Sequence, residues 1–448
     1  MSKLFHRALI AGTGPVAVQL AVMLKRYWKC TVGIAGRQSV RSAPFFDALR
    51  QSDSTVRAEV QNSQHHGLEG EYQIDSVYDS YELVAGQWDV LILSVTADAY
   101  VHVLELLQRQ VLHRLQCVVL ISPTFGSNAL VTEYLQENRC TAEVLSFSTY
   151  LGDTRRLDDK PFNYVLTTAV KRKVYAGAAF TDCETAAIES AQSAEAFQEL
   201  YRDSGISLEV VNSPLEAETR NISLYVHPPL FMNEISLGVI FDRPAVPKFV
   251  YKLFPEGPIT MQLIKELLRQ WEEISALVRK LGGAPVNLLQ FMVDDNYPVR
   301  PESLPRHEID RFPQLSPVQQ QYLLFVRYAS LLIDPFSEPD EAGKYFDFSA
   351  VPIRHIFINH EGAWDIPRMP KEDYYRIKII QGIAKDAGLQ CPMIDAFIDR
   401  YEHMLSAAAR KLQGETLSEA FTIQSFERDI RRICRQLLPS IRGSHKQP

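Results

Sequence analysis

The chain has 448 residues, of which 46% are hydrophobic, and a formal net charge of −7. This length allows two or three domains with a sizeable core. The charge excludes a global basic field of the kind that attracts nucleic acid or anionic membranes. Because there is neither a signal-peptide pattern nor an apolar run of about 18 residues, the sequence predicts a cytoplasmic protein without a membrane span.

The cysteines and histidines do not form a metal-binding pattern. The six cysteines lie far apart and include no CxxC pair, which argues against structural zinc and, in a large cytoplasmic chain, against a disulfide framework. His65 and His66 are adjacent, but consecutive side chains point apart on either regular element. We therefore predict that the protein has no metal site.

The first predicted element is a strand, turn and amphipathic helix at residues 8–21. Gly12 allows a tight turn, Gly14 lets the backbone approach a pyrophosphate, and Ala17 keeps the helix close to the strand. Phosphates are favoured at such a helix N-terminus. A glycine-rich turn made only for packing is the alternative. The cofactor-binding residues predicted here are Gly12, Thr13, Gly14, Pro15 and Val16.

A second predicted strand, residues 31–36, ends at Gly36 and Arg37. NAD sites usually carry Asp or Glu at this position to bind the ribose 2′-hydroxyl. Gly36 leaves a 2′-phosphate uncontested, and Arg37 offers it a planar guanidinium, with Arg41 as a second candidate ligand. The pattern favours NADP(H) as the cofactor, and two solvated loop arginines are the alternative.

Three further buried strands are predicted after a polar stretch at residues 51–79. Their apolar runs occupy residues 88–96, 117–122 and 143–149, and each ends in a polar or glycine-rich loop. The carboxyl ends of such strands line the ligand crevice of an open α/β sheet. We predict that Thr96, Pro123 and Thr124 bind the cofactor, and that Asp153 and Arg155 face the substrate.

From Tyr164 the pattern changes. Short β runs at 164–168, 173–178 and 207–212 are expected as antiparallel additions to the sheet, with a helix rich in Glu and Ala before the last. Beyond Pro214 the periodicity is helical, with long segments near 263–281, 318–333, 371–386 and 392–411. The predicted fold class is α/β, with an N-terminal Rossmann-type dinucleotide-binding domain (1–213) followed by a mostly α-helical catalytic domain (214–448).

His227 is the candidate acid–base group. It precedes Pro228 and Pro229, which biases its backbone away from helix and predicts a junction residue. It could be a satisfied core histidine, but its polar surroundings and its place near the domain junction favour a ligand cleft. Tyr225 beside it and Lys252 in the loop 251–260 are, with Arg155, candidate substrate-binding residues.

The stretch 334–349, aromatic with embedded carboxylates, is a further candidate wall of the substrate site. Like the loop 251–260, it is equally compatible with an ordinary loop packed on the core.

Ten segments of the chain resemble those of a known family. They are GTGPVAVQLA, GRQSVR, SVTADAY, VVLISPTFGS, SFSTYLGDTR, AETRNISLYVHPPLFMN, VYKLFPEGPITM, VNLLQFMVDDNYPVRPE, IDPFSEPDEAGKYFDFSAVP and PRMPKEDYYR. They are similar to segments of the opine dehydrogenases that make bacterial opine-type metallophores, the staphylopine dehydrogenase-like enzymes. The resemblance covers nearly the whole chain, and only the tail from about Leu412 matches nothing recognisable.

The resemblance implies a usually dimeric, two-domain enzyme that uses NADPH to condense an amino-acid-derived intermediate reductively with a 2-oxo acid, of which pyruvate is favoured and 2-oxoglutarate is the alternative. The intermediate is histidine carrying an aminobutyrate arm, and a nicotianamine-synthase-like partner enzyme supplies it. The family's catalytic histidine matches His227 and its cleft aspartate matches Asp153. A second basic residue near the 2′-phosphate, lysine in some members, is not matched, because Ala43 stands there.

This chemistry suits the residues. Histidine, with an unperturbed pKa near 6.5, can hold or deliver a proton at neutral pH, while Asp153 could bind the substrate ammonium or orient His227. Two alternatives stay open. An opine dehydrogenase that acts on a free amino acid predicts turnover without the aminobutyrate arm, and a non-catalytic NADP-binding regulator predicts no NADPH oxidation.

Overall fold

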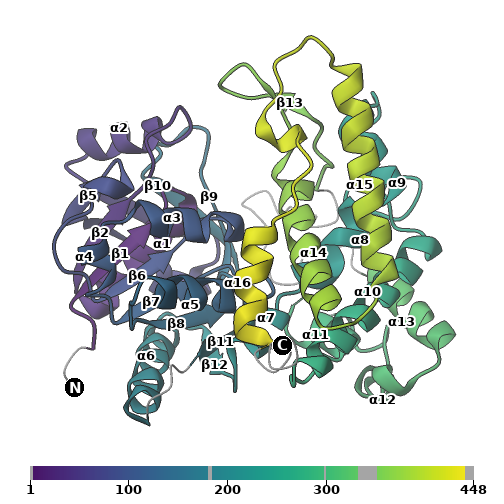
Figure 1. Cartoon of the computed structure of the whole chain (residues 1–448), viewed down its shortest axis with the longest axis horizontal. Helices are drawn as coiled ribbons and strands as arrows, with labels where there is room; N and C mark the ends of the chain where they lie inside the picture. The colour runs from purple at the N-terminus through teal and green to yellow at the C-terminus, as the bar shows by residue number, and fades with distance from the viewer. Residues whose placement is uncertain (1–3, 180–183, 297–298, 331–350, 439–448) are drawn as a thin grey trace, which may run out of the picture. The chain divides into compact units, whose positions relative to one another are not determined.

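The computed structural model describes all residues except 1–3, 180–183, 297–298, 331–350 and 439–448. The chain divides into two units, Met1–Arg220 and Asn221–Pro448. The first is α/β and the second is mostly helical, as predicted (Figure 1). Helix α7 (Pro214–Thr219) packs on strands β8 and β11 and therefore belongs to the first unit by its contacts. The domain boundary predicted between residues 213 and 214 stays a prediction.

The first unit is built on an eight-stranded sheet with the order β12-β11-β8-β7-β6-β1-β2-β5. Its strands are β1 (Arg7–Ala11), β2 (Thr31–Ala35), β5 (Ser76–Tyr78), β6 (Val90–Leu93), β7 (Cys117–Leu120), β8 (Glu143–Phe147), β11 (Lys173–Ala179) and β12 (Ser207–Val210). All neighbours are parallel except β8 and β11. The strand order reverses at β1, which is where an open α/β sheet binds its ligand.

A second sheet of four strands was not predicted. It has the order β4 (Gly70–Gln73), β3 (Thr55–Val60), β10 (Tyr164–Val170) and β9 (Gly152–Arg155). The polar stretch 51–79 thus contains strands, and the predicted loop carrying Asp153 is strand β9. Strand β10 pairs with β3 and β9 rather than extending the main sheet. Strands β11 and β12 do extend it, and both run antiparallel to its other strands, as predicted. Periodicity identifies a strand but not its partner.

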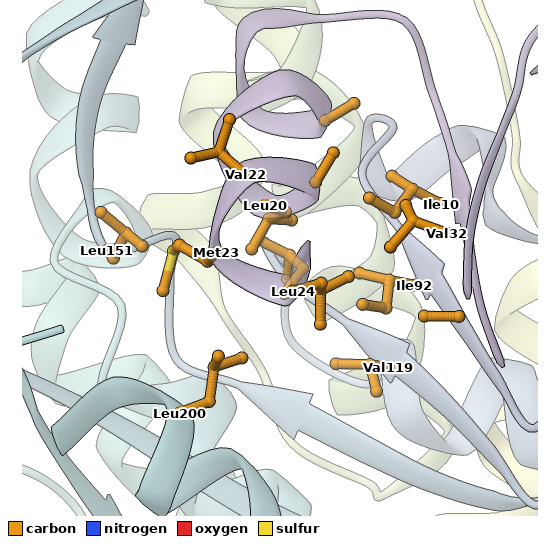
Figure 2. Packing of buried hydrophobic residues seen from close by; sticks show 14 of the residues in the cluster. Ile10, Leu20, Val22, Met23, Leu24, Val32, Ile92, Val119, Leu151 and Leu200 are labelled. Carbon is orange, nitrogen blue, oxygen red and sulfur yellow. The ribbon is translucent and has the colours of Figure 1, made fainter. Parts of the chain in front are cut away.

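Helix α1 (Pro15–Met23) is buried all round rather than amphipathic. The main sheet covers one side and the second sheet covers the other, so only an apolar helix fits. Figure 2 shows Leu24 beside Ile92, and Met23 beside Leu151, in the same core. The polar exception, Gln19, donates to the Leu68 carbonyl at 2.7 Å and accepts from Thr167 at 2.7 Å.

The remaining helices of the first unit lie around these sheets. They are α2 (Ala43–Gln51), α3 (Tyr100–Leu106), α4 (Arg109–Leu112), α5 (Ser127–Glu137) and α6 (Glu184–Asp203), with the short η1 (Leu24–Trp28), η2 (Ser63–Leu68), η3 (Tyr81–Leu83) and η4 (Ala97–Ala99). Helix α6 is the predicted Glu- and Ala-rich helix, and its position before β12 is confirmed.

The second unit is a helical assembly around α8 (Ser223–Phe231), which packs against α9 (Glu234–Asp242), α10 (Met261–Lys280) and α14 (Arg368–Asp386). The others are α11 (Leu288–Asp294), α12 (Arg306–Asp310), α13 (Pro317–Ala329), α15 (Pro392–Lys411) and α16 (Glu427–Leu437), with η5 (Phe312–Gln314), η7 (Glu419–Phe421), β13 (Phe357–Ile358) and β14 (Trp364–Asp365). The four long predicted helices correspond to α10, α13, α14 and α15. The end of the second predicted segment, residues 331–333, and the stretch 334–349 lie outside the described residues.

The described part of the segment beyond Leu412, residues 413–438, docks on α14. The Tyr375 hydroxyl donates to Asp429 at 3.0 Å, and the ring of Phe426 meets that of Tyr375 edge-on at 4.9 Å. A frayed tail was predicted only for residues 442–448, which lie outside the described residues.

The sequence predicts that the chain has no membrane span and no disulfide framework. Within the ranges that the structure describes, no helix is both long and apolar enough to cross a membrane. The five described cysteines form no disulfide with one another, and four of them are buried; Cys183 lies outside the described residues.

Candidate functional site

The two glycines of the first turn serve different purposes. Gly12 has φ of +135°, and a Cβ there would lie 2.5 Å from the Ser94 hydroxyl, so the fold itself requires glycine. Gly14 has an ordinary φ of −79°, and no atom lies within 4 Å of the Cβ position. Packing therefore does not demand glycine at position 14, and the space beside it is open for a ligand.

The N-terminus of α1 is the predicted phosphate site. Gly14 is its N-cap and Pro15 its first helical residue, and no side chain caps the end. Thr13, Pro15 and Val16 are half-buried. The uncapped N–H groups and the helix dipole favour an anion at this end.

Arg37 and Arg41 follow β2 and are exposed. Neither forms an ion pair with any described residue. Gly36 lies tightly against Thr13, because a Cβ on Gly36 would overlap the Thr13 side chain. The end of β2 and the glycine turn are thus in contact, which places both arginines near the turn.

The predicted residues after β6 and β7 lie at the same sheet edge, because β1, β6 and β7 are adjacent parallel strands. Thr96 is exposed, whereas Pro123 and Thr124 are buried. The Thr124 hydroxyl is buried without a hydrogen-bond partner, and its backbone N–H donates to Ser127 at 2.9 Å. The structure therefore brings the ten predicted cofactor-binding residues to one region of the first unit.

Glu218 is a buried carboxylate in this region that sequence reasoning missed. It accepts hydrogen bonds from the backbone N–H groups of Gly126 at 2.8 Å and Asn128 at 2.7 Å, and from the Ser146 hydroxyl at 3.1 Å. Burial raises the pKa of Glu218 to about 8, although the three donors lower it. Glu218 thus fastens α7 to the first turn of α5.

This pKa makes stability depend on pH. The native state keeps the proton between the ordinary value of 4.5 and about 8, whereas the unfolded state releases it, so the parent should lose up to about 1.4 kcal/mol per pH unit as pH rises through this window. Glu218→Gln should remove this slope. Urea unfolding of both proteins at pH 5, 6.5 and 8 tests the prediction, and parallel pH dependences would contradict it.

His227 lies inside helix α8, so the prediction of a non-helical junction residue was wrong. Pro228 lacks the N–H that would bond to the Leu224 carbonyl. The buried side chain of Gln270 donates to that carbonyl instead, at 2.8 Å, which reduces the cost of proline inside the helix. The His227 ring packs edge-on against Phe231 at 5.4 Å and its side chain stays 17% exposed.

A buried carboxylate, also missed from the sequence, faces His227. Oδ1 of Asp373 lies 3.6 Å from Nδ1 of His227 and pairs with the guanidinium of Arg376. His227 Nδ1 and Asp373 Oδ2 are both buried and have no hydrogen-bond partner. At 3.6 Å the contact is too long for a hydrogen bond, so the carboxylate faces the imidazole without bonding to it.

The other predicted residues are distributed over both units. Asp153 has an exposed side chain, pairs with Arg155 and accepts from Thr168 at 3.1 Å. Tyr225 is only 1% exposed and packs near Phe291, and Lys252 is half-buried in its loop. Asp153 thus forms an ion pair with Arg155, and His227 lies beside Asp373. The substrate contacts of Arg155, Tyr225 and Lys252 stay predictions.

No group of three or more His, Cys, Asp or Glu side chains within the described ranges is arranged to hold a metal ion. His66 instead contacts Glu69 at 2.7 Å. Catalysis without a protein-bound metal remains a prediction.

A comparison with known families matches residues 6–437 to staphylopine dehydrogenase. The chain belongs to the staphylopine dehydrogenase family. It is therefore an opine dehydrogenase, an oxidoreductase that acts on CH–NH bonds. The match extends well past Leu412, so the expectation that the tail beyond it lacks relatives was wrong.

Individual relatives agree with this assignment. The chain is 46% identical to staphylopine synthase of Staphylococcus aureus, with 96% of both chains covered, and 38% identical to pseudopaline synthase of Pseudomonas aeruginosa, with 89% of both covered. A solved structure titled yersinopine dehydrogenase with NADP+ bound superposes with a TM-score of 0.87 at 28% identity, covering 97% of this chain and 99% of that one.

Proposed function

We propose that this enzyme uses NADPH to condense an aminobutyrate-histidine intermediate with a 2-oxo acid, pyruvate or 2-oxoglutarate, as the last step in the synthesis of an opine-type metallophore. Family membership and the NADP+-bound relative support this. The observation that carries it is the position of the buried Asp373 carboxylate, 3.6 Å from Nδ1 of His227. The proposal includes a nicotianamine-synthase-like enzyme as the supplier of the intermediate, and a homodimer as the assembly.

The residues present fit the cofactor. The N-terminus of α1 is uncapped, the space at Gly14 is open, and Arg37 and Arg41 lack carboxylate partners among the described residues. Gly12–Val16 would hold the pyrophosphate, and the two arginines the 2′-phosphate. Bound NADPH supplies the hydride that reduces the imine carbon.

The protein orients the reactants and moves protons. The amine adds to the carbonyl of the 2-oxo acid and water leaves, which gives the imine; a hydride and a proton then convert the C=N bond into CH–NH. His227 exchanges the protons of these steps, and Asp373 holds its ring and balances its charge. Asp153 binds the substrate ammonium, Arg155 and Lys252 bind carboxylates, and Tyr225 shapes the wall beside His227.

An assay with NADPH, EDTA, the aminobutyrate-histidine intermediate and each 2-oxo acid tests the proposal. NADPH should be consumed only when both substrates are present, and chelation should leave the rate unchanged. Equal turnover of free histidine would favour the simpler opine dehydrogenase. No consumption would favour the regulator, and loss of activity restored by one metal would contradict metal-free catalysis.

Replacing Arg37 by Ala should erase most of the preference for NADPH over NADH. A charge-assisted guanidinium–phosphate pair exists only with NADPH, so the ratio of the two kcat/KM values should fall by about 10–100-fold. Arg57→Ala is the control, since Arg57 pairs with Glu59 on the second sheet. Equal ratios in the parent and Arg37→Ala would make Arg37 an ordinary surface residue.

A further inference from the structure

Arg156 directly follows strand β9 and is fixed against the glycine turn. Its Nη2 donates to the Thr13 carbonyl. The guanidinium lies over the ring of Phe162, 4.3 Å from its centroid, and 6.0 Å from the centroid of Phe45. Two aromatic rings and one carbonyl therefore set the direction of this cation.

Arg156 has no counter-ion among the residues that the structure describes. Its Nε is buried without a hydrogen-bond partner. The charged group that acts on it is another cation, Arg41: burial, with a smaller contribution from Arg41, lowers the pKa of Arg156 to about 10.

Two other arginines, the buried Arg376 and the half-buried Arg400, have carboxylate partners. Arg376 pairs with Asp373, and Arg400 pairs with Glu266 at 3.2 Å. Buried charges are normally paired, because removing a lone ion from water is costly. A half-buried arginine held beside another cation is the arrangement expected where the anion comes from a ligand.

The position of Arg156 indicates which part of the ligand it meets. Thr13, whose carbonyl it binds, packs against Gly36, and Gly36 precedes Arg37. In a Rossmann-type fold the end of this second strand reads the ribose of the adenosine, at its 2′ position. Arg156, Arg41 and Arg37 therefore all lie near the junction of the first turn and the second strand.

We propose that Arg156 is a specificity-determining residue that binds the 2′-phosphate of NADP(H) together with Arg37 and Arg41. The proposal rests on the cofactor choice in the proposed function. Nη2 is committed to Thr13, which leaves the other nitrogens of the fork for phosphate oxygens. The competing role is a purely structural one, in which Arg156 only stabilises the conformation of the glycine turn through its hydrogen bond to Thr13.

Calorimetric titration of the purified protein with NADP+ and with NAD+ separates these roles without relying on turnover. In Arg156→Met the Kd for NADP+ should rise by about 10–100-fold and the Kd for NAD+ by less than about threefold, because only NADP+ loses a charge-assisted contact. Arg156→Lys keeps the charge without the fork, and should show a smaller loss of at least about threefold.

Arg26→Gln is the matched control, since Arg26 also donates to a backbone carbonyl, that of Glu69, and lies over a ring, that of Tyr27. It should leave both Kd values unchanged. Equal weakening of both cofactors in the Arg156 variants, or weakening of neither, would overturn the proposal. A parent that does not prefer NADP+ would instead contradict the proposed cofactor. If the circular dichroism spectrum shows that Arg156→Met is misfolded, the Kd values of Arg156→Lys for NADP+ and NAD+ decide between the two roles.

Discussion

Replacing His227 by Gln is expected to lower turnover by about 10²–10⁴-fold, the usual contribution of a positioned acid–base group. Gln keeps the approximate size and some hydrogen bonding but cannot titrate. The affinity for NADPH should stay near that of the parent, because the predicted cofactor contacts lie in the other unit. Steady-state kinetics across pH 5–9, with a fluorescence titration of NADPH, measure both effects.

His403→Gln is the matched control, because His403 is exposed on helix α15 of the same unit. It should retain the parent's rate. A His227→Gln variant with parent-like turnover and an unchanged pH profile would remove His227 from the chemistry. The histidine would then be a packing residue against Phe231.

The second large effect is expected from Asp373→Asn. The carboxylate faces His227 and pairs with Arg376 in the interior, so the amide leaves a buried guanidinium unpaired. The free energy of unfolding should fall by about 3–5 kcal/mol, the usual cost of breaking a buried pair. Turnover should fall because His227 loses its orienting group, while the KM values stay near those of the parent.

A double-mutant cycle shows whether Asp373 acts through His227. The double variant His227→Gln/Asp373→Asn should be no slower than His227→Gln alone, because residues that act as one unit are not additive. Asp399→Asn, an exposed change on α15, is the control. Effects that multiply in the double variant would show that Asp373 only supports the fold.

Asp153→Ala separates the two aspartates. If Asp153 binds the substrate ammonium, its loss should raise the KM of the amine as well as lower turnover. A pure fall in turnover would instead assign an orienting role to Asp153.

Local sequence patterns predicted most elements of both units. The runs 31–36 and 117–122 are β2 and β7, and the segment 392–411 is α15 with the same ends. What failed depended on distant partners. Proline before and inside a helix is locally unfavourable, yet α8 continues through Pro228 because Gln270, far along the chain, satisfies the freed carbonyl.

In the candidate site, too, the residues with a local sequence signal were predictable and their distant partners were not. The glycine turn, Arg37 and His227 each carry a local signal. The structure places Arg37 near the turn, because Gly36 before it packs against Thr13. Asp373 and Arg376 have the spacing of a helical i,i+3 ion pair, but nothing in that spacing points to His227. Arg156 carries no local signal in the sequence, because only the fold shows that it lacks a carboxylate partner among the described residues.

The central claim is that this chain transfers a hydride from NADPH to the carbon that was the carbonyl of a 2-oxo acid. It is tested by incubating the enzyme with NADPH deuterated at nicotinamide C4 on the transferred face, the aminobutyrate-histidine intermediate and pyruvate or 2-oxoglutarate, and recording the product by mass spectrometry. We predict a secondary amine with the mass of both substrates minus water plus one hydrogen and one deuterium, with the deuterium on the former carbonyl carbon. A product without deuterium, or no product while NADPH binds, would contradict the assignment.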